Sequence, residues 1–293
     1  MFDTTVVAWD GTPEARAAAE WAAARSADGH IVLAHVAGRG IAEAEFFAAD
    51  SPAARARVHL DEDAERLRRD YPGTRFETRL LTGDREEALV AQTTPRTLLV
   101  IGHRPRRTRL RWSFTARLAG TVKGTLAVVP AAGQGGSGIV VGVDGSAQAV
   151  AALEAAADEA ERSGAEVTVV HAWQLPLTLE DEDLYEEAYL EGAELMREAM
   201  LEELIASTGA RHPRVLFRAE VLGGPAAHAL KAASEDAAML VVGNRHRSLG
   251  ARLFLGSVAA ALIAAPARPT LIVNADLADL VPTGERTLGL SVG

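Results

Sequence analysis

The sequence predicts an α/β protein built from two tandem copies of one domain, each with a five-stranded, mostly parallel sheet and helices on both faces. The first reason is an alternation along the chain, in which short apolar segments are separated by longer segments rich in Ala, Glu and Arg. Buried parallel strands connected by right-handed helical crossovers produce this pattern. The second reason is that the strand-like segments of the first half recur, in the same order, in the second half.

The first half begins with an apolar strand, after which Thr12 can cap a helix and Pro13 suits its first turn. A second, longer helical stretch has a possible break at Ser51 and Pro52. Apolar runs bounded by turn residues predict the other strands. In order, the expected strands are residues 5–9, 31–36, 76–81, 97–101 and 126–129, and the expected helices are residues 15–27, 41–70, 85–92 and 115–122.

The second half repeats these segments. Residues 140–146 read Val-Val-Gly-Val-Asp-Gly-Ser, and residues 6–12 read Val-Val-Ala-Trp-Asp-Gly-Thr. The second strand of each half carries a histidine near its end, His35 or His171. The other matched segments are 80–84 with 221–225, 99–102 with 240–243, and 126–129 with 270–273.

A Gly-rich stretch at residues 133–138 separates the two series and reads as a flexible linker. We therefore expect an N-terminal domain at residues 1–131 and a C-terminal domain at residues 138–275. Residues 276–293 would form a C-terminal tail.

The composition narrows the class of function. The chain of 293 residues is 48% hydrophobic and 24% charged, the balance of a globular protein, and its formal net charge is −10. This charge disfavours general binding to nucleic acid or to anionic membranes. There is no cysteine, which excludes disulfides, thiolate metal sites and cysteine nucleophiles. No apolar run has membrane-spanning length and the first residues do not resemble a signal peptide, so a cytoplasmic protein is expected.

The strongest candidate for a binding site runs from the fourth strand of the second half into the next helix. Residues 239–242 suit a buried strand, and Gly243 lets backbone approach a ligand without a Cβ in the way. Ser257 can cap the helix, whose first N–H groups favour an anion such as a phosphate. The alternative is a tight strand-to-helix connection that needs glycine for packing. Further cationic partners for an anion would be Arg245, Arg247 and Arg252.

Three features together resemble the universal stress protein family: a strand ending in Val-Asp-Gly-Ser, a strand ending in His, and Val-Val-Gly followed by Leu-Gly-Ser-Val. The nucleotide-binding members share a motif of Gly, two residues, Gly, nine residues, and Gly-Ser or Gly-Thr. Gly243, His246, Gly256 and Ser257 match this spacing, with His246 in place of the second glycine. The histidine either weakens binding through backbone strain or adds a phosphate contact.

The resemblance covers residues 4–130 and 138–274, and the repeat makes the chain similar to a tandem member. It implies Rossmann-like domains of the adenine nucleotide alpha hydrolase type that bind ATP, with or without Mg²⁺. Asp144 would then meet the adenosine end of ATP, the backbone around Ala172 would border the base, and the start of the last helix would hold phosphates. The implied binding residues are Asp144, Ala172, Val242, Gly243, Arg245, His246, Gly256, Ser257 and Val258, with weaker counterparts at Asp10, Val36 and Gly102.

The first half departs from the motif after its fourth strand. The loop is three residues shorter than its counterpart, with Pro105 where the second glycine would be and Trp112 opposite Gly256. Proline removes an N–H donor, and an indole ring would crowd a phosphate. Asp10 is present, but we expect no phosphate cradle there. The five arginines of this loop either bind another anion, an RNA segment or an acidic partner, or form a solvated surface.

These observations predict an ATP-binding regulatory protein of the stress response, with the nucleotide held mainly by the C-terminal domain. No set of residues is committed to activating a water or stabilising a transition state, so we expect a binding module rather than an enzyme. The alternatives are a slow ATPase or phosphotransferase that uses the loop arginines, and a nucleotide-free interaction scaffold.

The fifth strands, residues 126–129 and 270–273, are short and apolar and would expose unpaired backbone groups at a sheet edge. The family resemblance implies that they pair across a pseudo-twofold axis, here within one chain, and that a homodimer can form on another face. The alternative is two independent domains on the Gly-rich linker.

Overall fold

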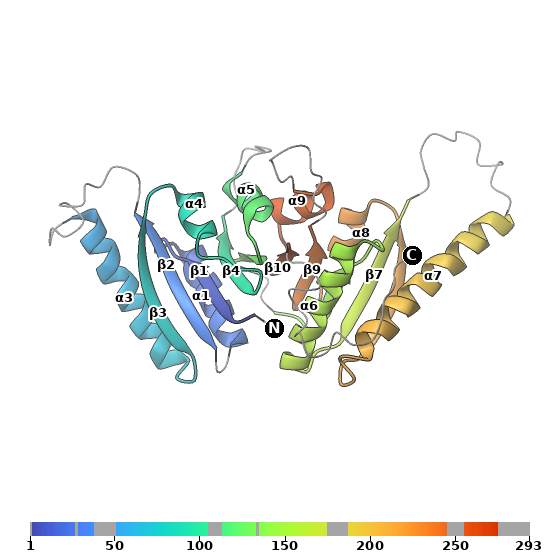
Figure 1. The fold of residues 1–293 in the computed structure, drawn as a ribbon, viewed down its shortest axis with the longest axis horizontal. Helices are drawn as coiled ribbons and strands as arrows, with labels where there is room; N and C mark the ends of the chain where they lie inside the picture. The colour runs from blue at the N-terminus through green and yellow to red at the C-terminus, as the bar shows by residue number, and fades with distance from the viewer. Residues whose placement is uncertain are drawn as a thin grey trace.

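The computed structural model describes residues 2–26, 29–37, 51–104, 113–132, 135–174, 187–244 and 255–274. Its ten strands form one sheet with helices on both faces (Figure 1). The first repeat contains β1 (Thr4–Ala8), α1 (Pro13–Arg25), β2 (His30–Ala37), α3 (Pro52–Asp70), β3 (Arg75–Thr82), α4 (Arg85–Val90), β4 (Thr97–His103), α5 (Phe114–Thr121) and β5 (Thr125–Pro130).

The second repeat has the same order of elements. It contains β6 (Ile139–Gly142), α6 (Ala147–Ser163), β7 (Val167–Trp173), α7 (Glu187–Gly209), β8 (Phe217–Gly223), α8 (Ala226–Ala233), β9 (Met239–Gly243), α9 (Ser257–Ala264) and β10 (Thr270–Val273). None of the helices within the described ranges is both long enough and apolar enough to cross a bilayer.

The strand order across the sheet is β3-β2-β1-β4-β5-β10-β9-β6-β7-β8. All pairs within a repeat are parallel, and only the central pair, β5 with β10, is antiparallel. The predicted fold class is therefore confirmed. The expected strands of the first half are present, with ends that differ by two residues or fewer, the usual uncertainty of element boundaries.

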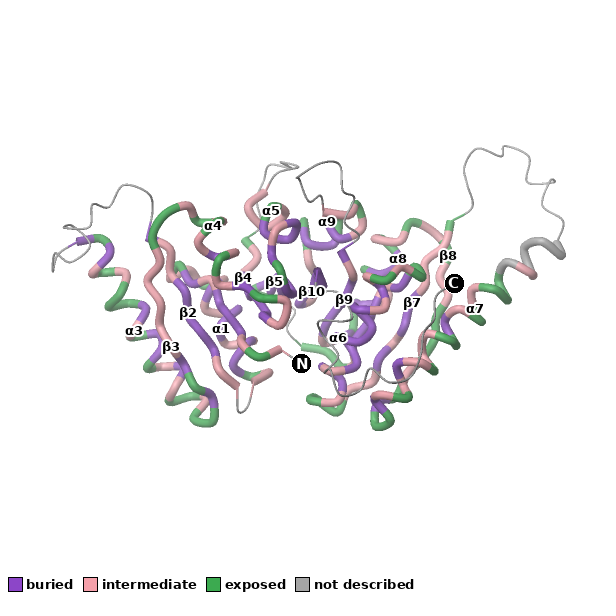
Figure 2. The backbone as a smooth tube through the Cα atoms, in the orientation of Figure 1, coloured by how far each residue is buried: buried purple, intermediate pink, exposed green. Residues whose placement is uncertain are grey.

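Two hydrophobic clusters cover the two faces of the sheet, and each includes residues from both repeats. On one face the strands pack against α1, α3, α6 and α7. On the other they pack against α4, α5, α8 and α9. The middle strands are buried along their length, whereas the outer strands β3 and β8 are largely half-buried or exposed (Figure 2). This gradient explains why the middle strands read as continuous apolar runs.

Helix starts follow the predicted capping with one correction. Thr12 caps α1, accepting a hydrogen bond from the Ala15 N–H at 3.3 Å. Ser51 caps α3, which begins at Pro52, and the rest of the helical stretch expected before it lies outside the described residues. The prediction that Ser257 caps α9 was wrong, because Gly256 is at the N-cap and makes no side-chain capping bond.

The two repeats meet where β5 pairs with β10. Ala127 pairs with Leu271, with Leu126 opposite Ile272 and Val128 opposite Thr270. Because β5 and β10 pair with β4 and β9 in matching registers, Leu126 corresponds to Thr270 and Ala127 to Leu271. The pairing is therefore symmetric about the Ala127–Leu271 pair. It also satisfies the backbone groups of two strands that would otherwise be sheet edges.

An ion pair between α1 and α6 lies across this boundary. Arg25 Nε donates to Glu159 Oε2 at 2.9 Å, and the two side chains are only 9% and 3% exposed. Arg162 Nη2 also bonds Glu159 Oε2, at 2.5 Å. Burial, together with the nearby Arg162 charge, lowers the pKa of Arg25 to about 9, so it stays charged at neutral pH. The pair thus joins opposite charges in a site with little solvent.

Arg25 lies as many residues after Asp10 as Glu159 lies after Asp144, so the pair occupies corresponding positions of the two repeats. If two N-terminal domains met in this way, arginine would face arginine. Two C-terminal domains would place glutamate against glutamate. Like charges buried at a contact disfavour that contact, so the pair favours association of unlike repeats.

We expect Arg25→Glu to lower the free energy of unfolding by about 3–5 kcal/mol, the scale for leaving a buried charge without its partner. The exchanged pair, Arg25→Glu with Glu159→Arg, should recover part of this loss, because the opposite charges face one another again while Arg162 becomes a like-charged neighbour. Urea unfolding measures both. The control is Arg214→Glu, at an 82% exposed side chain. If Arg25→Glu lowers the free energy of unfolding no more than Arg214→Glu does, the buried ion pair does not stabilise the contact between the repeats.

Candidate functional site

The candidate site lies at the carboxyl ends of β6, β7 and β9. The connection from β6 leads to β7 on one side, while β9 lies on its other side, so the strand order switches between β6 and β9. Gly142 pairs with Val242, which sets Gly243 beside the residues that follow β6. Ala172 lies near the end of the neighbouring β7. In open parallel sheets such a switch point is where ligands bind.

Asp144 begins the turn into α6. Its Oδ1 accepts hydrogen bonds from the Ser146 N–H at 3.0 Å and from Ser146 Oγ at 2.5 Å. Gly145 between them has φ of 77°, a conformation that favours glycine. Ser146 in turn caps α6. The Asp-Gly-Ser sequence is therefore explained locally as a turn and a helix cap, and the Asp144 carboxylate is held at the exposed strand end.

The first repeat builds the same turn with one addition. Asp10 Oδ1 accepts from Thr12 Oγ1 at 2.6 Å, and Asp10 Oδ2 also pairs with Arg85 Nη2 at 3.1 Å. The Arg85 guanidinium lies over the Phe114 ring, 4.9 Å from its centroid. Burial raises the pKa of Asp10, but the hydrogen bonds from Thr12 and the interaction with Arg85 outweigh it, so the pKa lies below its ordinary value.

The position of Arg85 is occupied by Ala226 in the second repeat. Gly83 and Gly224 have φ of 104° and 108°, and Arg85 and Ala226 lie equally far after them. The two strand-end carboxylates therefore differ in their surroundings. In the first repeat an arginine of the same domain already pairs with the carboxylate, and in the second that arginine is replaced by a methyl group.

The two histidines near the strand ends have matching structural roles. His35 Nδ1 donates to the Trp9 carbonyl at 2.9 Å, and His171 Nδ1 donates to the Val143 carbonyl at 3.0 Å. A carbonyl only accepts, so Nδ1 carries the hydrogen in both. Each histidine ties the end of one central strand to its neighbour.

Gly243, the last residue of β9, and Gly102, the residue before the last of β4, lie where the first helix of each repeat packs closely. A Cβ built on Gly243 would lie 2.3 Å from the Gln148 carbonyl oxygen, and one on Gly102 would lie 2.3 Å from that of Glu14. The sequence left two reasons for glycine at position 243 open, the approach of a ligand and close packing. In the structure the space that a Cβ would take at Gly243 belongs to α6, so close helix–strand packing is the reason for glycine.

The start of α9 faces the end of β9. The Gly256 N–H donates to Asn244 Oδ1 at 3.1 Å, and the first helical bond runs from the Ala260 N–H to the Gly256 carbonyl at 2.9 Å. The N–H groups of Ser257 and Val258 therefore lie before Ala260, the first helical donor, and have no acceptor within the helix, which is the arrangement that binds anions at helix starts. Ser257 is exposed and Val258 half-buried.

Sequence reasoning missed Asn244, which directly follows the buried β9 and is itself fully buried. The available signal was a polar residue between a strand and a loop, which is too common to identify a role. Several predicted residues cannot be compared, because they lie outside the described residues: Arg245, His246, Arg247 and Arg252 in the second repeat, and Pro105 and Trp112 in the first. Val242 is buried in β9, and Val36 is half-buried in β2.

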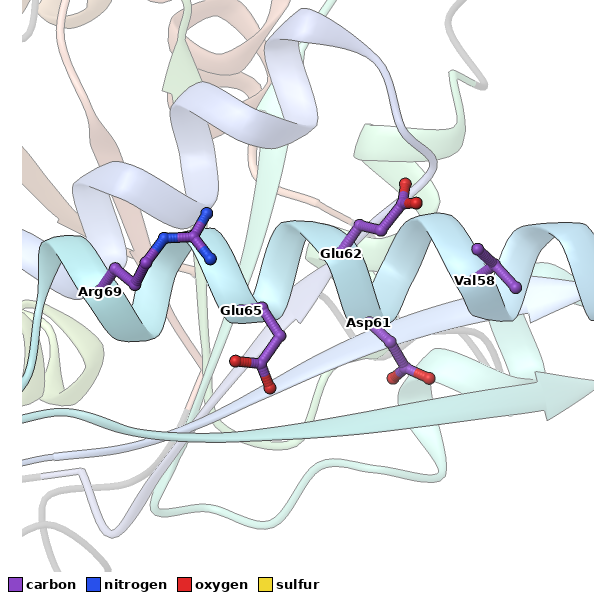
Figure 3. A pocket seen from close by; sticks show the side chains of 5 residues that line it. All are labelled: Val58, Asp61, Glu62, Glu65 and Arg69. Atoms are coloured by element: carbon purple, nitrogen blue, oxygen red, sulfur yellow. The ribbon is translucent and has the colours of Figure 1, made fainter.

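A shallow hollow also lies on α3, far from these strand ends. Val58, Asp61, Glu62, Glu65 and Arg69 line it. Figure 3 shows that all five come from this one helix and that Glu62 and Arg69 project to one side while Asp61 and Glu65 project to the other. Asp61 already accepts from Thr78 Oγ1, and Glu65 pairs with Arg68. These groups do not converge on a ligand, so we place the site at the strand ends.

We expect Gly243→Ala to lower the free energy of unfolding by about 1–3 kcal/mol, because the added methyl group pushes α6 away from the sheet. Gly223→Ala is the matched control at the end of β8, where a Cβ would meet nothing within 4 Å. It should change stability by less than about 0.5 kcal/mol. If both variants lose the same free energy of unfolding in urea, close packing of α6 does not explain the glycine at position 243.

Comparisons with known proteins agree with this architecture. A universal stress protein of Mycobacterium tuberculosis (strain ATCC 25618 / H37Rv) is 30% identical over 141 residues, covering 47% of this chain and 46% of that protein. The chain thus spans about half the length of the curated relatives it matches.

Two solved structures match nearly the whole chain. One, from Pseudomonas aeruginosa UCBPP-PA14 and described by the same family name, has a TM-score of 0.64 and 16% identity, covering 93% of both chains. A universal stress protein from Archaeoglobus fulgidus DSM 4304 has a TM-score of 0.61 and 17% identity, covering 92% of this chain and 98% of that one. These likenesses support the fold. The model of the universal stress protein family matches residues 1–130 and 138–274, so the chain belongs to that family as a tandem member.

Proposed function

We propose that the chain is an ATP-binding regulatory protein of the stress response and that its C-terminal domain holds the nucleotide. The observation that carries the proposal is the start of α9. There the N–H groups of Ser257 and Val258 come before Ala260, whose N–H makes the first helical hydrogen bond. This helix start is anchored to the end of β9 at the switch point of the sheet. A helix start at this place in a doubly wound sheet suits a phosphate group.

The adenosine end of ATP would lie toward β6 and β7. The Asp144 carboxylate, held by Ser146, would accept a hydrogen bond from a ribose hydroxyl or the adenine amino group. Ala172 on the neighbouring strand would border the base. His171 would act indirectly, because its Nδ1 ties β7 to the carbonyl just before Asp144.

We favour binding over catalysis. Rapid phosphoryl transfer requires an oriented nucleophile and cations placed against the transferring phosphate. The sequence shows no motif committed to either task. A slow ATPase and a scaffold without nucleotide are the competing functions, and ATP titration followed by phosphate release separates the three.

Gly256→Trp should reduce ATP affinity at least tenfold, because an indole at the N-cap of α9 would occupy the space in front of its N–H groups. Isothermal titration calorimetry measures the loss. The control is Gly135→Trp in the linker, where a Cβ would meet nothing within 4 Å. Unchanged affinity in the Gly256 variant, with the control also unchanged, would remove the start of α9 from the site.

We expect one ATP per chain, because in the first repeat Trp112 stands opposite Gly256 and Pro105 takes the place of the second glycine of the motif. Native mass spectrometry of the full chain counts the bound nucleotide. Asp144→Ala should weaken binding by about 1–3 kcal/mol, the scale for a hydrogen bond to a charged group. Asp10→Ala should leave the affinity unchanged. Saturation at two nucleotides, reduced to one by Asp10→Ala, would establish a second site in the N-terminal domain.

We also propose that the repeats act in solution as one unit paired through β5 and β10, and that any homodimer uses another face. The symmetric strand register and the Arg25–Glu159 pair support this proposal. Independent domains on a flexible linker would instead tumble separately, which NMR relaxation of the intact chain distinguishes.

A further inference from the structure

Two buried asparagines connect the start of α9 with the other repeat. Asn244 follows β9 and is 0% exposed, and Asn274 follows β10 and is 9% exposed. Buried amides of this kind are costly unless their donors and acceptors are satisfied. Their partners therefore indicate what these two side chains hold together.

On one side the amides bind the end of α5 in the N-terminal domain. Asn274 Nδ2 donates to the carbonyls of Ala119 and Val122, at 3.1 and 3.0 Å. Asn244 Nδ2 donates to the same Ala119 carbonyl at 3.2 Å. Ala119 lies in the last turn of α5 and Val122 is its C-cap, so the helix offers neither carbonyl a further donor. The C-terminal domain thus supplies the cap of a helix in its neighbour.

On the other side the amides reach the candidate phosphate site. Asn244 Nδ2 also donates to Asn274 Oδ1 at 2.8 Å. Asn244 Oδ1 accepts the Gly256 N–H at 3.1 Å. A continuous set of hydrogen bonds therefore runs from the end of α5, through both side-chain amides, to the N-cap of α9. The helices α5 and α9 lie side by side where the repeats meet (Figure 1).

The corresponding positions of the first repeat differ. His103 follows Gly102 as Asn244 follows Gly243, and Pro130 follows Val129 as Asn274 follows Val273. Proline has no side-chain amide and cannot bridge two carbonyls. The N-terminal repeat therefore lacks the same pair of amides to offer α9. The amide bridge, the hydrogen bonds from the end of α5 through Asn274 and Asn244 to Gly256, therefore reaches the start of α9 and has no equivalent at the start of α5. It ends in the repeat that keeps the nucleotide motif.

We infer that Asn274 and Asn244 are positioning residues through which the N-terminal domain completes the nucleotide site of the C-terminal domain. The inference rests on the proposed binding of phosphate at the start of α9. With the Gly256 N–H held by Asn244, the next two N–H groups are oriented before a ligand arrives. Because the helix start is already ordered, less conformational entropy is lost when the ligand binds, and the affinity is higher. The N-terminal domain thereby contributes to ATP binding without binding ATP itself.

The test uses the full chain with Asn274→Leu, which keeps a similar volume and removes the amide. Two measurements are made: ATP affinity by calorimetry, and hydrogen exchange at residues 256–258 without nucleotide. We expect affinity to fall about five- to twentyfold, within the usual range of coupling between sites. Exchange at the Gly256 amide should accelerate at the same time. Asn274→Ser, which retains one hydroxyl donor, should give a smaller effect and serves if the leucine variant fails to fold.

Leu67→Ala is the control for lost stability, because Leu67 is 1% exposed in α3 of the N-terminal domain and belongs to the cluster on the opposite face from α5. It should destabilise the chain without changing exchange at residues 256–258. If Asn274 acts through Asn244, the double variant Asn244→Ala/Asn274→Leu should bind ATP no more weakly than Asn244→Ala alone. Additive losses would overturn the inference.

Wild-type affinity in a folded Asn274→Leu chain would also overturn it. If the natural chain itself gives no ATP signal, the proposed function fails, and the exchange measurement still tests the bridge. Faster exchange at residues 256–258 in Asn274→Leu, absent in Leu67→Ala, would then support the ordering of the start of α9 by the two asparagines, while their contribution to ATP binding would fall with the proposed function. Equal exchange in the two variants would show that the two asparagines do not order the start of α9, and the inference would fail as well.

Discussion

The backbone pairing of β5 with β10 is the interaction on which the rest of the structure depends. Each repeat by itself would end in an apolar strand with unpaired N–H and C=O groups, a surface that seeks another strand. Pairing these edges turns two sheets into one and makes both hydrophobic clusters continuous from one repeat into the other. The contacts of α1 with α6, and of α5 with α9, exist only because the strands meet.

Duplication within one chain allows corresponding positions to diverge, which a symmetric pair of identical domains cannot do. Near the symmetry axis, Arg25 meets Glu159, its counterpart with the opposite charge. Asn274 reaches α5, while its counterpart Pro130 has no amide to offer. At the strand ends, Arg85 pairs with Asp10, while its counterpart is an alanine. At each of these three places the two repeats have different side chains in corresponding positions, so the structure around them is not symmetric.

Part of the local structure around the candidate site could be predicted, because short segments of sequence determine it. The turn at Asp144 and the switch from strand to helix around Gly243 follow from a few adjacent residues. The reason for glycine at position 243 could not be predicted, since glycine admits either a ligand or a helix and only the packing of α6 decides between them. The N-cap of α9 is Gly256 and not Ser257 as expected, and the Gly256 N–H donates to Asn244, a residue that the sequence did not connect with this helix.

The sequence by itself determined the strands, their succession along the chain and the internal repeat, because apolar periodicity and turn residues act over a few neighbouring positions. The family resemblance implied that the fifth strands pair, but only the tertiary structure decided the register of β5 with β10 and which side chains lie between the repeats. Arg25 and Glu159, and Asn274 and Ala119, are more than a hundred residues apart in sequence. Single charges and amides carry no periodic signal, so their partners are identified only when β5 and β10 bring the two repeats together.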